Sequence, residues 1–443
     1  MPAMTGRLQG RARALALEIA AEARAEWGYA SEIIARSFRA HRELASGDRR
    51  RISETVYGLI RMDRRLDAIL EELAGRELRE LGPVARDELK LLVYEVREGL
   101  PLEAAQADAK RLLDSADLAR AAGDEAGLGK RAGLEREAVR LSYPSWMLET
   151  FTNDLGPAGG TALAEAMNTR APMALRVNTT RISREALAAR LAEEHVIARP
   201  TPLAPAGLVL ETRVNAFGLT AFQEGLFEVM DEGSQVVAEL VAPPPGGRVV
   251  DACAGAGGKT LAIGASMDGK GRLLALDTDG KKLEELRRRA RRAGLTNVTA
   301  RPVTAEGTTL PTEARPGGWD RVLVDAPCSG TGTLRRNPEA RWRLTADVVR
   351  AFPPRQLALL VTYAPLVAVG GRLIYATCSV VDAENEGVVS RFVAERDDFV
   401  RVPVKEVWGK ERAATVGDGL TLRLAPHTHD TDGFFAAVLR RVR

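Results

Sequence analysis

The fold of this chain is decided by residues 248–277, which read RVVDACAGAGGKTLAIGASMDGKGRLLALD. A short apolar strand at 248–252 runs into a glycine-rich turn, and the turn opens a helix at 259–267. A second strand follows at 272–277. Small residues let the backbone bend sharply there, and the free amides at the start of the helix can meet a ligand. The stretch therefore predicts a strand, a ligand-binding turn, a helix and a second strand.

The same alternation continues toward the C-terminus. Predicted strands at 320–325 and 371–375 alternate with predicted helices at 280–293 and 355–367. Short apolar strands separated by helices favour a parallel sheet that is covered on both faces. We therefore predict a Rossmann-like, doubly wound α/β domain over residues 246–443, which begins at the proline and glycine run 243–247.

Two more domains are expected before it. Residues 141–245 combine short strands at 174–177 and 207–212 with a helix at 184–194, which predicts a small α+β module. Residues 1–140 read as helix after helix, rich in Ala, Leu, Glu and Arg, which predicts an all-α bundle.

One segment of this bundle has an apolar face lined by arginines. The apolar residues recur at mostly helical spacing and are Ile52, Val56, Ile60, Leu66, Ile69 and Leu70. The arginines are Arg49, Arg50, Arg51, Arg61, Arg64 and Arg65. Two interpretations stay open for them, a solvated helix face and a surface that contacts phosphates.

The composition excludes several classes of protein. The chain has 443 residues, 45% of them hydrophobic and 28% charged, as in ordinary globular proteins. No apolar stretch approaches the ~20 residues of a membrane span. The N-terminus resembles neither a secretory signal nor a transit peptide. We therefore expect a cytoplasmic protein that has no membrane association and is a monomer.

Metal and disulfide chemistry are not expected either. Three cysteines without a CxxC spacing make neither a disulfide framework nor a structural zinc site, and four histidines supply few metal ligands. The net charge of +3 is compatible with a polyanionic partner but does not establish one.

The glycine-rich turn is not a nucleotide-binding loop of the two commonest kinds. Cys253 occupies the position of the first glycine of a Walker loop, and the third glycine of a dinucleotide fingerprint is missing. Asp277 ends the second strand, where an acidic side chain accepts hydrogen bonds from ribose hydroxyls. The pair of features favours an adenosine-type ligand. Glu306 could reach the adenine amino group from the next loop, or it is an exposed loop carboxylate.

Two cysteines follow neighbouring strands. Cys328 stands in VDAPCSGTG at 324–332, and Cys378 stands in YATCS at 375–379. Both lie just past the carboxyl ends of their strands, so we expect them to face one site. Thiolate attack on carbon 6 of a cytosine lets carbon 5 accept a methyl group, and a second thiol or thiolate can assist the elimination that follows. Asp325 can hydrogen-bond the ring nitrogen. Spacing alone does not say which cysteine attacks.

The motifs DACAGAGGKT, VDAPCSGTG with the following LRRNPEARWR, and YATCS together resemble the Sun/Nop (RsmB-like) family of RNA 5-methylcytosine methyltransferases. Two upstream stretches, LRVN at 175–178 and FQEGLFEVMDEGSQ at 222–235, extend the resemblance from about residue 143 to the end. The helical N-terminus resembles the NusB-type RNA-binding domain more loosely, and the middle module is expected to be RRM-like.

The resemblance implies S-adenosylmethionine as cofactor, without a metal, and small-subunit (16S) rRNA as partner. It implies that Cys378 is the nucleophile and that Cys328 promotes release of the methylated product. Cofactor contacts carry over to Cys253, Ala254, Gly255, Ala256, Gly257, Gly258, Lys259, Asp277, Glu306 and Asp325. The alternatives are the same chemistry on tRNA or DNA, and a non-catalytic RNA-binding or ribosome-assembly factor.

The chain departs from the family pattern at three places. The usual Ala-Ala-Pro of the turn reads Ala254-Gly255-Ala256, Glu306 replaces an aspartate, and Met230 stands where glutamine is common. The first change loosens the turn without removing its amides.

Two clusters of arginines are candidate RNA contacts. Arg335, Arg336, Arg341 and Arg343 flank Trp342 after the Cys328 loop, and we predict that this cluster contacts the substrate through charge and stacking. A second cluster, Arg287, Arg288, Arg289, Arg291 and Arg292, lies on one predicted helix, where a solvated face is the favoured interpretation.

Overall fold

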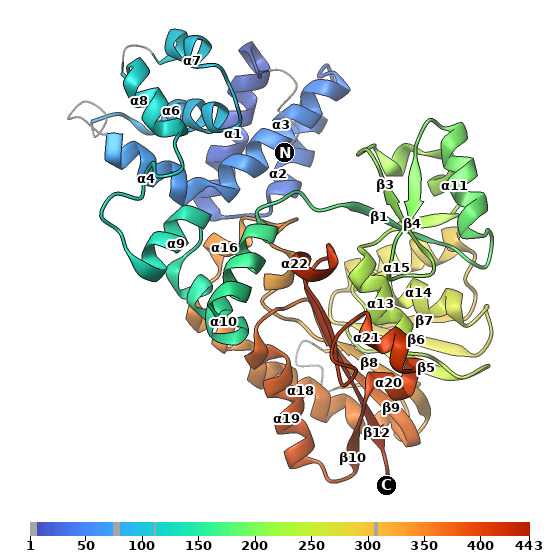
Figure 1. Ribbon diagram of the computed structural model, residues 1–443. Coiled ribbons are helices and arrows are strands. Elements are labelled where there is room, and N and C mark those ends of the chain that lie inside the picture. The colour runs from blue at the N-terminus through green and yellow to red at the C-terminus, as the bar shows by residue number, and fades with distance from the viewer. Residues whose placement is uncertain (1–6, 74–79, 110–111, 305–308) are drawn as a thin grey trace. The chain divides into compact units, whose positions relative to one another are not determined.

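A computed structural model describes residues 7–73, 80–109, 112–304 and 309–443 (Figure 1). Its chain divides into two compact units. The first, here the helical unit, comprises Met1–Thr169 and Leu334–Ala346. The second, here the sheet unit, comprises Arg170–Thr333 and Asp347–Arg443. In the described part of the chain, no helix has the length and apolar character needed to cross a membrane.

The sheet unit is built on an eight-stranded sheet whose strands run in the order β10-β12-β9-β8-β5-β6-β7, with β11 paired to β12. The strands are β5 (Arg248–Asp251), β6 (Arg272–Asp277), β7 (Val298–Pro302), β8 (Trp319–Asp325), β9 (Val367–Thr377), β10 (Phe399–Val402), β11 (Leu422–Leu424) and β12 (Phe434–Arg441). Strands β5 to β9 are mutually parallel, as predicted. The antiparallel strand β12 beside β9 was not predicted.

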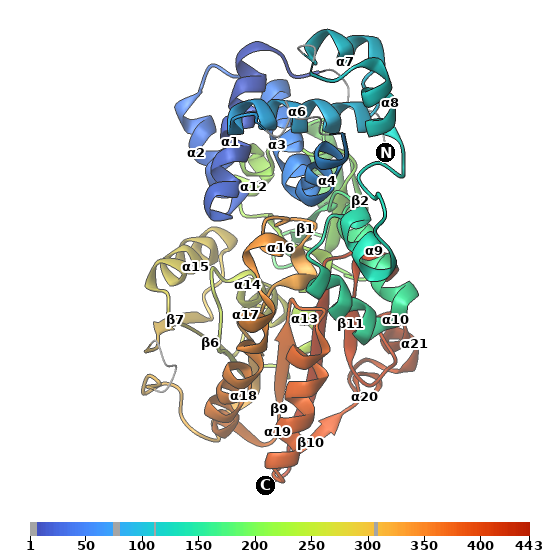
Figure 2. The ribbon, with the colours of Figure 1, turned by 90° about the vertical axis from the view of Figure 1, so that its left-hand side faces the viewer.

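Helices cover both faces of this sheet, which confirms the doubly wound α/β prediction. Val250 points into a core with α18 (Phe352–Tyr363) and α19 (Glu386–Glu395), and Figure 2 shows these two helices side by side. Val249, one residue earlier, points into the opposite core, because side chains alternate along a strand. That second core is closed by α13 (Glu232–Leu240), α14 (Gly258–Ser266), α20 (Val404–Trp408) and α21 (Lys410–Ala414).

Further elements complete this part of the sheet unit. Helix α15 (Gly280–Ala293) packs Leu283 and Leu286 against Ala275 of β6. The short elements are η2 (Thr331–Thr333), α17 (Ala346–Arg350), η3 (Ala364–Leu366), η4 (Asp382–Glu384) and α22 (Pro426–His429).

The sheet unit also contains a small antiparallel sheet with strand order β2-β3-β1-β4. Its strands are β1 (Met173–Val177), β2 (Ala198–Pro200), β3 (Gly207–Leu210) and β4 (Phe227–Val229), and its helices are α11 (Arg184–Glu193), η1 (Ala216–Gly218) and α12 (Thr220–Gln223). Leu187 and Leu191 of α11 pack on Leu175 and Leu208 of the strands. This is the predicted α+β module, with two strands more than the sequence indicated.

The helical unit is built from helices that bury one apolar face each. They are α1 (Gly10–Glu26), α2 (Ala30–Ala40), α3 (Ser46–Arg61), α4 (Asp63–Leu73), α6 (Pro83–Arg97), α7 (Leu102–Asp108), α8 (Ser115–Ala122), α9 (Gly133–Leu141), α10 (Ser145–Met167) and α16 (Ala340–Arg343). The six apolar residues predicted from Ile52 to Leu70 are all buried. The all-α prediction is therefore confirmed, with one addition: α16 comes from far along the chain, beyond the Cys328 loop.

Candidate active site

The thiols of Cys328 and Cys378 lie together at one edge of the large sheet. Cys328 follows β8, and Cys378 comes directly after β9, its parallel neighbour. The two Sγ atoms are 3.4 Å apart, and both side chains are half-buried. The structure therefore brings the two cysteines to one site, as their positions at neighbouring strand ends predict.

The surroundings of Cys328 favour its protonated form. Its hydrogen bond with Cys378, burial, and the negative charges of Cys378 and Glu384 raise the pKa of the Cys328 thiol well above its usual range. A thiol that keeps its proton can donate it, so Cys328 can act as the donor to Cys378 in a contact whose geometry allows either sulfur to donate. A hydrogen bond of this kind stabilises the thiolate form of the acceptor sulfur.

An ion pair joins the glycine-rich turn to the Cys328 loop. Lys259 lies in the first turn of α14, and its Nζ donates to Oδ2 of Asp325, the last residue of β8, at 2.6 Å. Burial alone would lower the pKa of Lys259, but the charge of Asp325 and the hydrogen bond to it raise the pKa above its ordinary value. Lys259 is therefore a fixed positive charge beside Asp325, and it also faces the ring of Phe434, whose centre is 5.3 Å away.

The glycine-rich turn adopts backbone angles that favour glycine. Gly255 has φ +54° and Gly257 has φ +88°. The backbone N–H of Gly255 donates to Oδ2 of Asp277 at 2.8 Å. Asp277, the residue predicted to bind ribose, is therefore fixed against the glycine-rich turn. Ala254 N–H donates to Leu276 O. A Cβ at Gly255 or Gly258 would meet no atom of the described part of the chain within 4 Å, so these residues leave the space over the turn open.

Two acidic or nucleophilic groups lie below the turn. The thiol of Cys253 has its pKa raised well above the usual range by burial and by the charges of Asp325, Asp251 and Asp277. Asp251 is 1% exposed, and its Oδ2 accepts a hydrogen bond from Thr260 Oγ1 at 2.6 Å. Its Oδ1 is buried and has no hydrogen-bond partner among the residues that the structure describes. Burial raises the pKa of Asp251 to about 7.

Asp251 was not among the predicted site residues, although it is the first residue of the DACAGAGGKT motif. A buried acid that ends a strand beneath a ligand-binding turn is the signal that could have found it. Glu306, by contrast, was predicted to contact the cofactor, and it lies outside the residues that the structure describes.

One of the arginines predicted to contact RNA after the Cys328 loop is buried in the helical unit instead. Arg341 is fully buried, donates to Asn168 Oδ1 at 2.8 Å and to Ser142 O at 3.1 Å, and has its guanidinium 4.0 Å from the centre of the Tyr143 ring. Burial lowers its pKa to about 10. The predicted role of Arg341 is therefore wrong.

The neighbouring side chains of this segment are engaged in the same way. Trp342 donates from Nε1 to Ile60 O at 2.7 Å, and its ring lies 5.7 Å from that of Trp27. Arg335 is 6% exposed. The guanidinium of Arg343 lies 4.5 Å from the ring centre of Tyr29. Trp342 is therefore not a free stacking surface, whereas Arg343 remains exposed beside the Tyr29 ring, and its predicted contact with the substrate stays a prediction.

The arginines of α3 and α4 are also occupied within the helical unit. Arg65 is 1% exposed and donates to Asp124 O at 2.6 Å. Arg64 binds the Tyr143 carbonyl and Glu135, and Arg49 donates to Leu44 O. Neither interpretation holds for the buried Arg65, and both stay open for the exposed Arg50.

Two of the arginines on α15 hold the small sheet. Arg289 and Arg292 both form ion pairs with Glu228 of β4, which is 4% exposed. The guanidinium of Arg292 also lies 3.9 Å from the ring centre of Phe222. Arg289 donates through Nη1 to Ala256 O at 2.7 Å, so one arginine contacts both the small sheet and the glycine-rich turn. For these two residues the favoured solvated-face interpretation is wrong.

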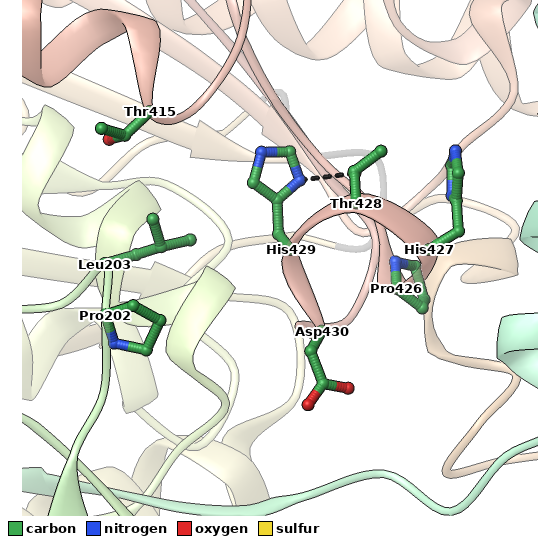
Figure 3. A pocket seen from close by; sticks show the side chains of 8 residues that line it. All are labelled: Pro202, Leu203, Thr415, Pro426, His427, Thr428, His429 and Asp430. Atoms are coloured by element: carbon green, nitrogen blue, oxygen red, sulfur yellow. Dashed lines mark hydrogen bonds between the residues drawn. The ribbon is translucent and has the colours of Figure 1, made fainter.

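A surface pocket of about 430 Å³ lies within the sheet unit and contains none of the predicted site residues (Figure 3). Its lining is Pro202, Leu203, Thr415 and the segment from Pro426 to Asp430. Burial lowers the pKa of both His427 and His429. Both rings therefore favour the neutral form, and the 2.7 Å contact of His429 Nδ1 with Thr428 Oγ1 fixes one of them.

Comparison with protein families gives three matches along the chain. Residues 238–440 match the family described as 16S rRNA methyltransferase RsmB/F. Residues 143–216 match the ferredoxin-like domain of RsmF/B-like methyltransferases, and residues 11–99 match the NusB family. The first match covers the large sheet, the second covers α10 and strands β1 to β3 of the small sheet, and the third covers helices of the helical unit.

Similar proteins and structures agree with these matches. The probable ribosomal RNA small subunit methyltransferase B of Synechocystis sp. is 34% identical, with 97% of this chain and 99% of that protein covered. The protein of the same name from Bacillus subtilis is 29% identical over 93% of this chain and 94% of its own length. The crystal structure of PH0851 has a TM-score of 0.77 at 27% identity, and it covers 98% of this chain and all of that one. The chain belongs to the RsmB/F (Sun) family of small-subunit ribosomal RNA methyltransferases.

Proposed function

We propose that this enzyme methylates carbon 5 of a cytosine in small-subunit rRNA, with S-adenosylmethionine as methyl donor and Cys378 as nucleophile. The observation that carries the proposal is the 3.4 Å separation of the Cys328 and Cys378 thiols. Carbons 5 and 6 of a pyrimidine are bonded neighbours, so a nucleophile for one and a base for the other must stand close together. Two adjacent thiols meet that requirement.

The residues of the glycine-rich turn fit S-adenosylmethionine. Open space lies over Gly255 and Gly258, where a ligand can approach the backbone closely. Asp277 stands at the end of β6, where it can accept hydrogen bonds from ribose hydroxyls. Asp251 offers a buried oxygen without a partner. When bound, S-adenosylmethionine supplies an electrophilic methyl group for carbon 5 and leaves as S-adenosylhomocysteine.

Cys378 begins the reaction as a thiolate. Its sulfur forms a bond to carbon 6, and the electron pair of the carbon 5–carbon 6 double bond becomes available at carbon 5 to accept the methyl group. The contact of the two sulfurs supports this choice of nucleophile, because an S–H on Cys328 is close enough to donate to the attacking sulfur. This argument from the structure agrees with the role that the family resemblance implies.

Cys328 completes the reaction as a base. Its raised pKa depends chiefly on the hydrogen bond to Cys378 and on burial, with the charge of Cys378 adding to them. Formation of the carbon–sulfur bond removes that charge, so the Cys328 thiol then loses its proton to solvent more easily. The Cys328 thiolate takes the proton from carbon 5, the double bond reforms, and the bond between carbon 6 and Cys378 breaks. Cys328 is again a thiol and Cys378 again a thiolate, with one proton released overall.

Asp325 orients the cytosine. Its carboxylate is held by Lys259 at 2.6 Å, which leaves the other oxygen to accept a hydrogen bond from the ring nitrogen once that nitrogen takes up a proton as negative charge develops on the pyrimidine. Lys259, a fixed cation, offsets negative charge at the same place.

The test uses radiolabelled S-adenosylmethionine with unmodified small-subunit rRNA, tRNA and DNA. We expect label in small-subunit rRNA as 5-methylcytosine, no product and no covalent adduct with Cys378→Ala, and a trapped protein–RNA adduct with Cys328→Ala. Full turnover by Cys378→Ala would refute the mechanism. Labelling of tRNA alone would contradict the substrate assignment, and no labelling at all would favour an assembly factor.

A further inference from the structure

A buried carboxylate that the proposed reaction does not use lies directly behind the two thiols. Glu384 ends η4, shortly after the Cys378 loop, and is fully buried. Burial of a charge is costly unless hydrogen bonds compensate it. Among the described residues, the donors to this carboxylate are neutral: the N–H and hydroxyl of Ser329, the hydroxyl of Ser379 and the amide of Gln356.

These donors belong to both cysteine loops. Ser329 follows Cys328, and its backbone N–H donates to Glu384 Oε2 at 2.8 Å. Ser379 follows Cys378, and its Oγ donates to Glu384 Oε1 at 2.7 Å. One carboxylate therefore holds the residue after each thiol.

Other hydrogen bonds reinforce the link. Gln356 Nε2 donates to Glu384 Oε2 and to Pro327 O, both at 3.0 Å, so the residue before Cys328 is also tied to the carboxylate. The hydroxyls of Thr331 and Ser379 lie 3.0 Å apart. The N–H of Gly332 donates to Cys378 O at 2.9 Å.

Cys378 has a second anchor that holds the residues on both of its sides, whereas Gln356 holds only the residue before Cys328. The side chain of Asn385 accepts from Thr377 Oγ1 at 2.6 Å and donates to Ser379 O at 3.0 Å, so it holds the residues on both sides of Cys378. The N–H of Ser329 is held by Glu384 itself. Loss of the Glu384 carboxylate should therefore displace Cys328 before it displaces Cys378.

We propose that Glu384 is a positioning residue, which fixes the spacing of the two thiols by clamping the residues that follow them. The inference rests on the proposed two-cysteine reaction and names a fully buried residue that would act through the two cysteine loops. Because displacement of a reacting group by about 1 Å can cost about 100-fold in rate, the clamp matters most for the step that needs Cys328. The negative charge of Glu384 also contributes to the raised pKa of Cys328.

The test compares Glu384→Gln and Ser329→Ala with Cys328→Ala on in vitro transcribed small-subunit rRNA. We expect Glu384→Gln to lower kcat by about 100-fold, with little change in the KM for rRNA or the KM for S-adenosylmethionine. The variant should also accumulate the covalent protein–RNA adduct, as Cys328→Ala does. Ser329→Ala removes one hydroxyl and should give the same adduct with a smaller loss of rate. Glu386→Gln is the matched control, because Glu386 pairs with Arg401 away from the thiols and should behave as wild type.

A purely structural role would give a different result. In Glu384→Gln, product formation, adduct formation and cofactor binding would then all fall together, along with the Tm. This outcome would overturn the role of Glu384 as a positioning residue. If that variant does not fold, Ser329→Ala decides: wild-type turnover without adduct overturns the proposal. If Cys328→Ala itself traps no adduct, the two-cysteine reaction fails. If Cys328→Ala traps adduct but the other two variants do not, the failure is confined to the role of Glu384.

Discussion

Lys259 Nζ lies 2.6 Å from Asp325 Oδ2, so the turn that is proposed to hold the cofactor and the strand end that carries Cys328 share one ion pair. Lys259 is 11% exposed as a side chain and Asp325 26%. A pair this shielded is screened less by salt than a surface pair. It sets the charge of the site and connects two of its parts.

Substitution of Lys259 by methionine should remove the fixed cation while keeping the side-chain length. We expect kcat to fall by about 100- to 1000-fold, because a group that stabilises developing charge is lost. Methyl transfer to rRNA measures the effect. Lys270→Met, at a lysine whose side chain is 74% exposed, is the control and should keep wild-type kcat. A Lys259→Met enzyme with the rate of this control would contradict the assignment.

Asp251 should make stability depend on pH. Its pKa is about 7 in the fold, against an ordinary value of 3.8, so between these values the folded state binds more protons than the unfolded state. Stability should therefore fall as pH rises from about 4 to about 7 and change little above that. Above pH 7, the ionised Asp251 should lower the free energy of unfolding by up to about 4 kcal/mol.

The variant Asp251→Asn checks this sign, because it cannot ionise and still accepts the hydrogen bond from Thr260. Urea unfolding of both proteins should show the variant gaining stability relative to wild type between pH 5 and pH 8. An equal difference at both pH values would mean that Asp251 does not titrate in this range.

The two glycines at the end of the turn should respond differently to alanine. Gly257 has φ +88°, and a Cβ there would lie 2.6 Å from Leu286 Cγ, so Gly257→Ala should lower the free energy of unfolding by about 1–3 kcal/mol. Gly258 begins α14 and has open space around it. Gly258→Ala should keep the Tm and weaken S-adenosylmethionine binding, measured by calorimetry. Equal cofactor affinity in Gly258→Ala and wild type would place the ligand elsewhere.

Trp342 should matter for stability and not as a direct RNA contact. Its ring packs beside Trp27, and its Nε1 donates to Ile60 O. Trp342→Ala should therefore cost about 2–4 kcal/mol in the helical unit, seen as a lower Tm in thermal unfolding. Arg350→Ala, at an exposed arginine, is the control and should leave the Tm unchanged. A variant with the wild-type Tm and weaker RNA binding would restore the substrate role.

The strands and the cysteine pair could be predicted because local pattern determines both. Runs such as Leu273 to Leu276 specify buried parallel strands, and equivalent positions after two neighbouring strands bring Cys328 and Cys378 together. The predicted limits after residues 140 and 245 stay predictions. Strand β12 was not predicted, although its apolar run at 434–439 is a signal that could have found it; the sequence alone does not show that it pairs antiparallel to β9.

The arginines show where the sequence was insufficient. Arg341 and an exposed arginine look alike in a sequence, since carbonyls from distant segments are what make burial of the guanidinium possible. Glu384 was missed for the same reason: its donors come from residues 329, 356 and 379, which only the fold assembles.

The segment Leu334–Ala346 has a consequence for how such enzymes change over evolution. The helical unit includes a stretch that lies after the Cys328 loop in sequence. The N-terminal helices alone therefore do not make up the whole unit. A shortened chain that begins at residue 170 would keep Trp342 and Arg341 but lose Trp27, Ile60 and Asn168, the partners that cover them. Gain or loss of the N-terminal helices therefore requires substitutions in the segment 334–346 as well. Relatives without these helices should carry a different sequence there.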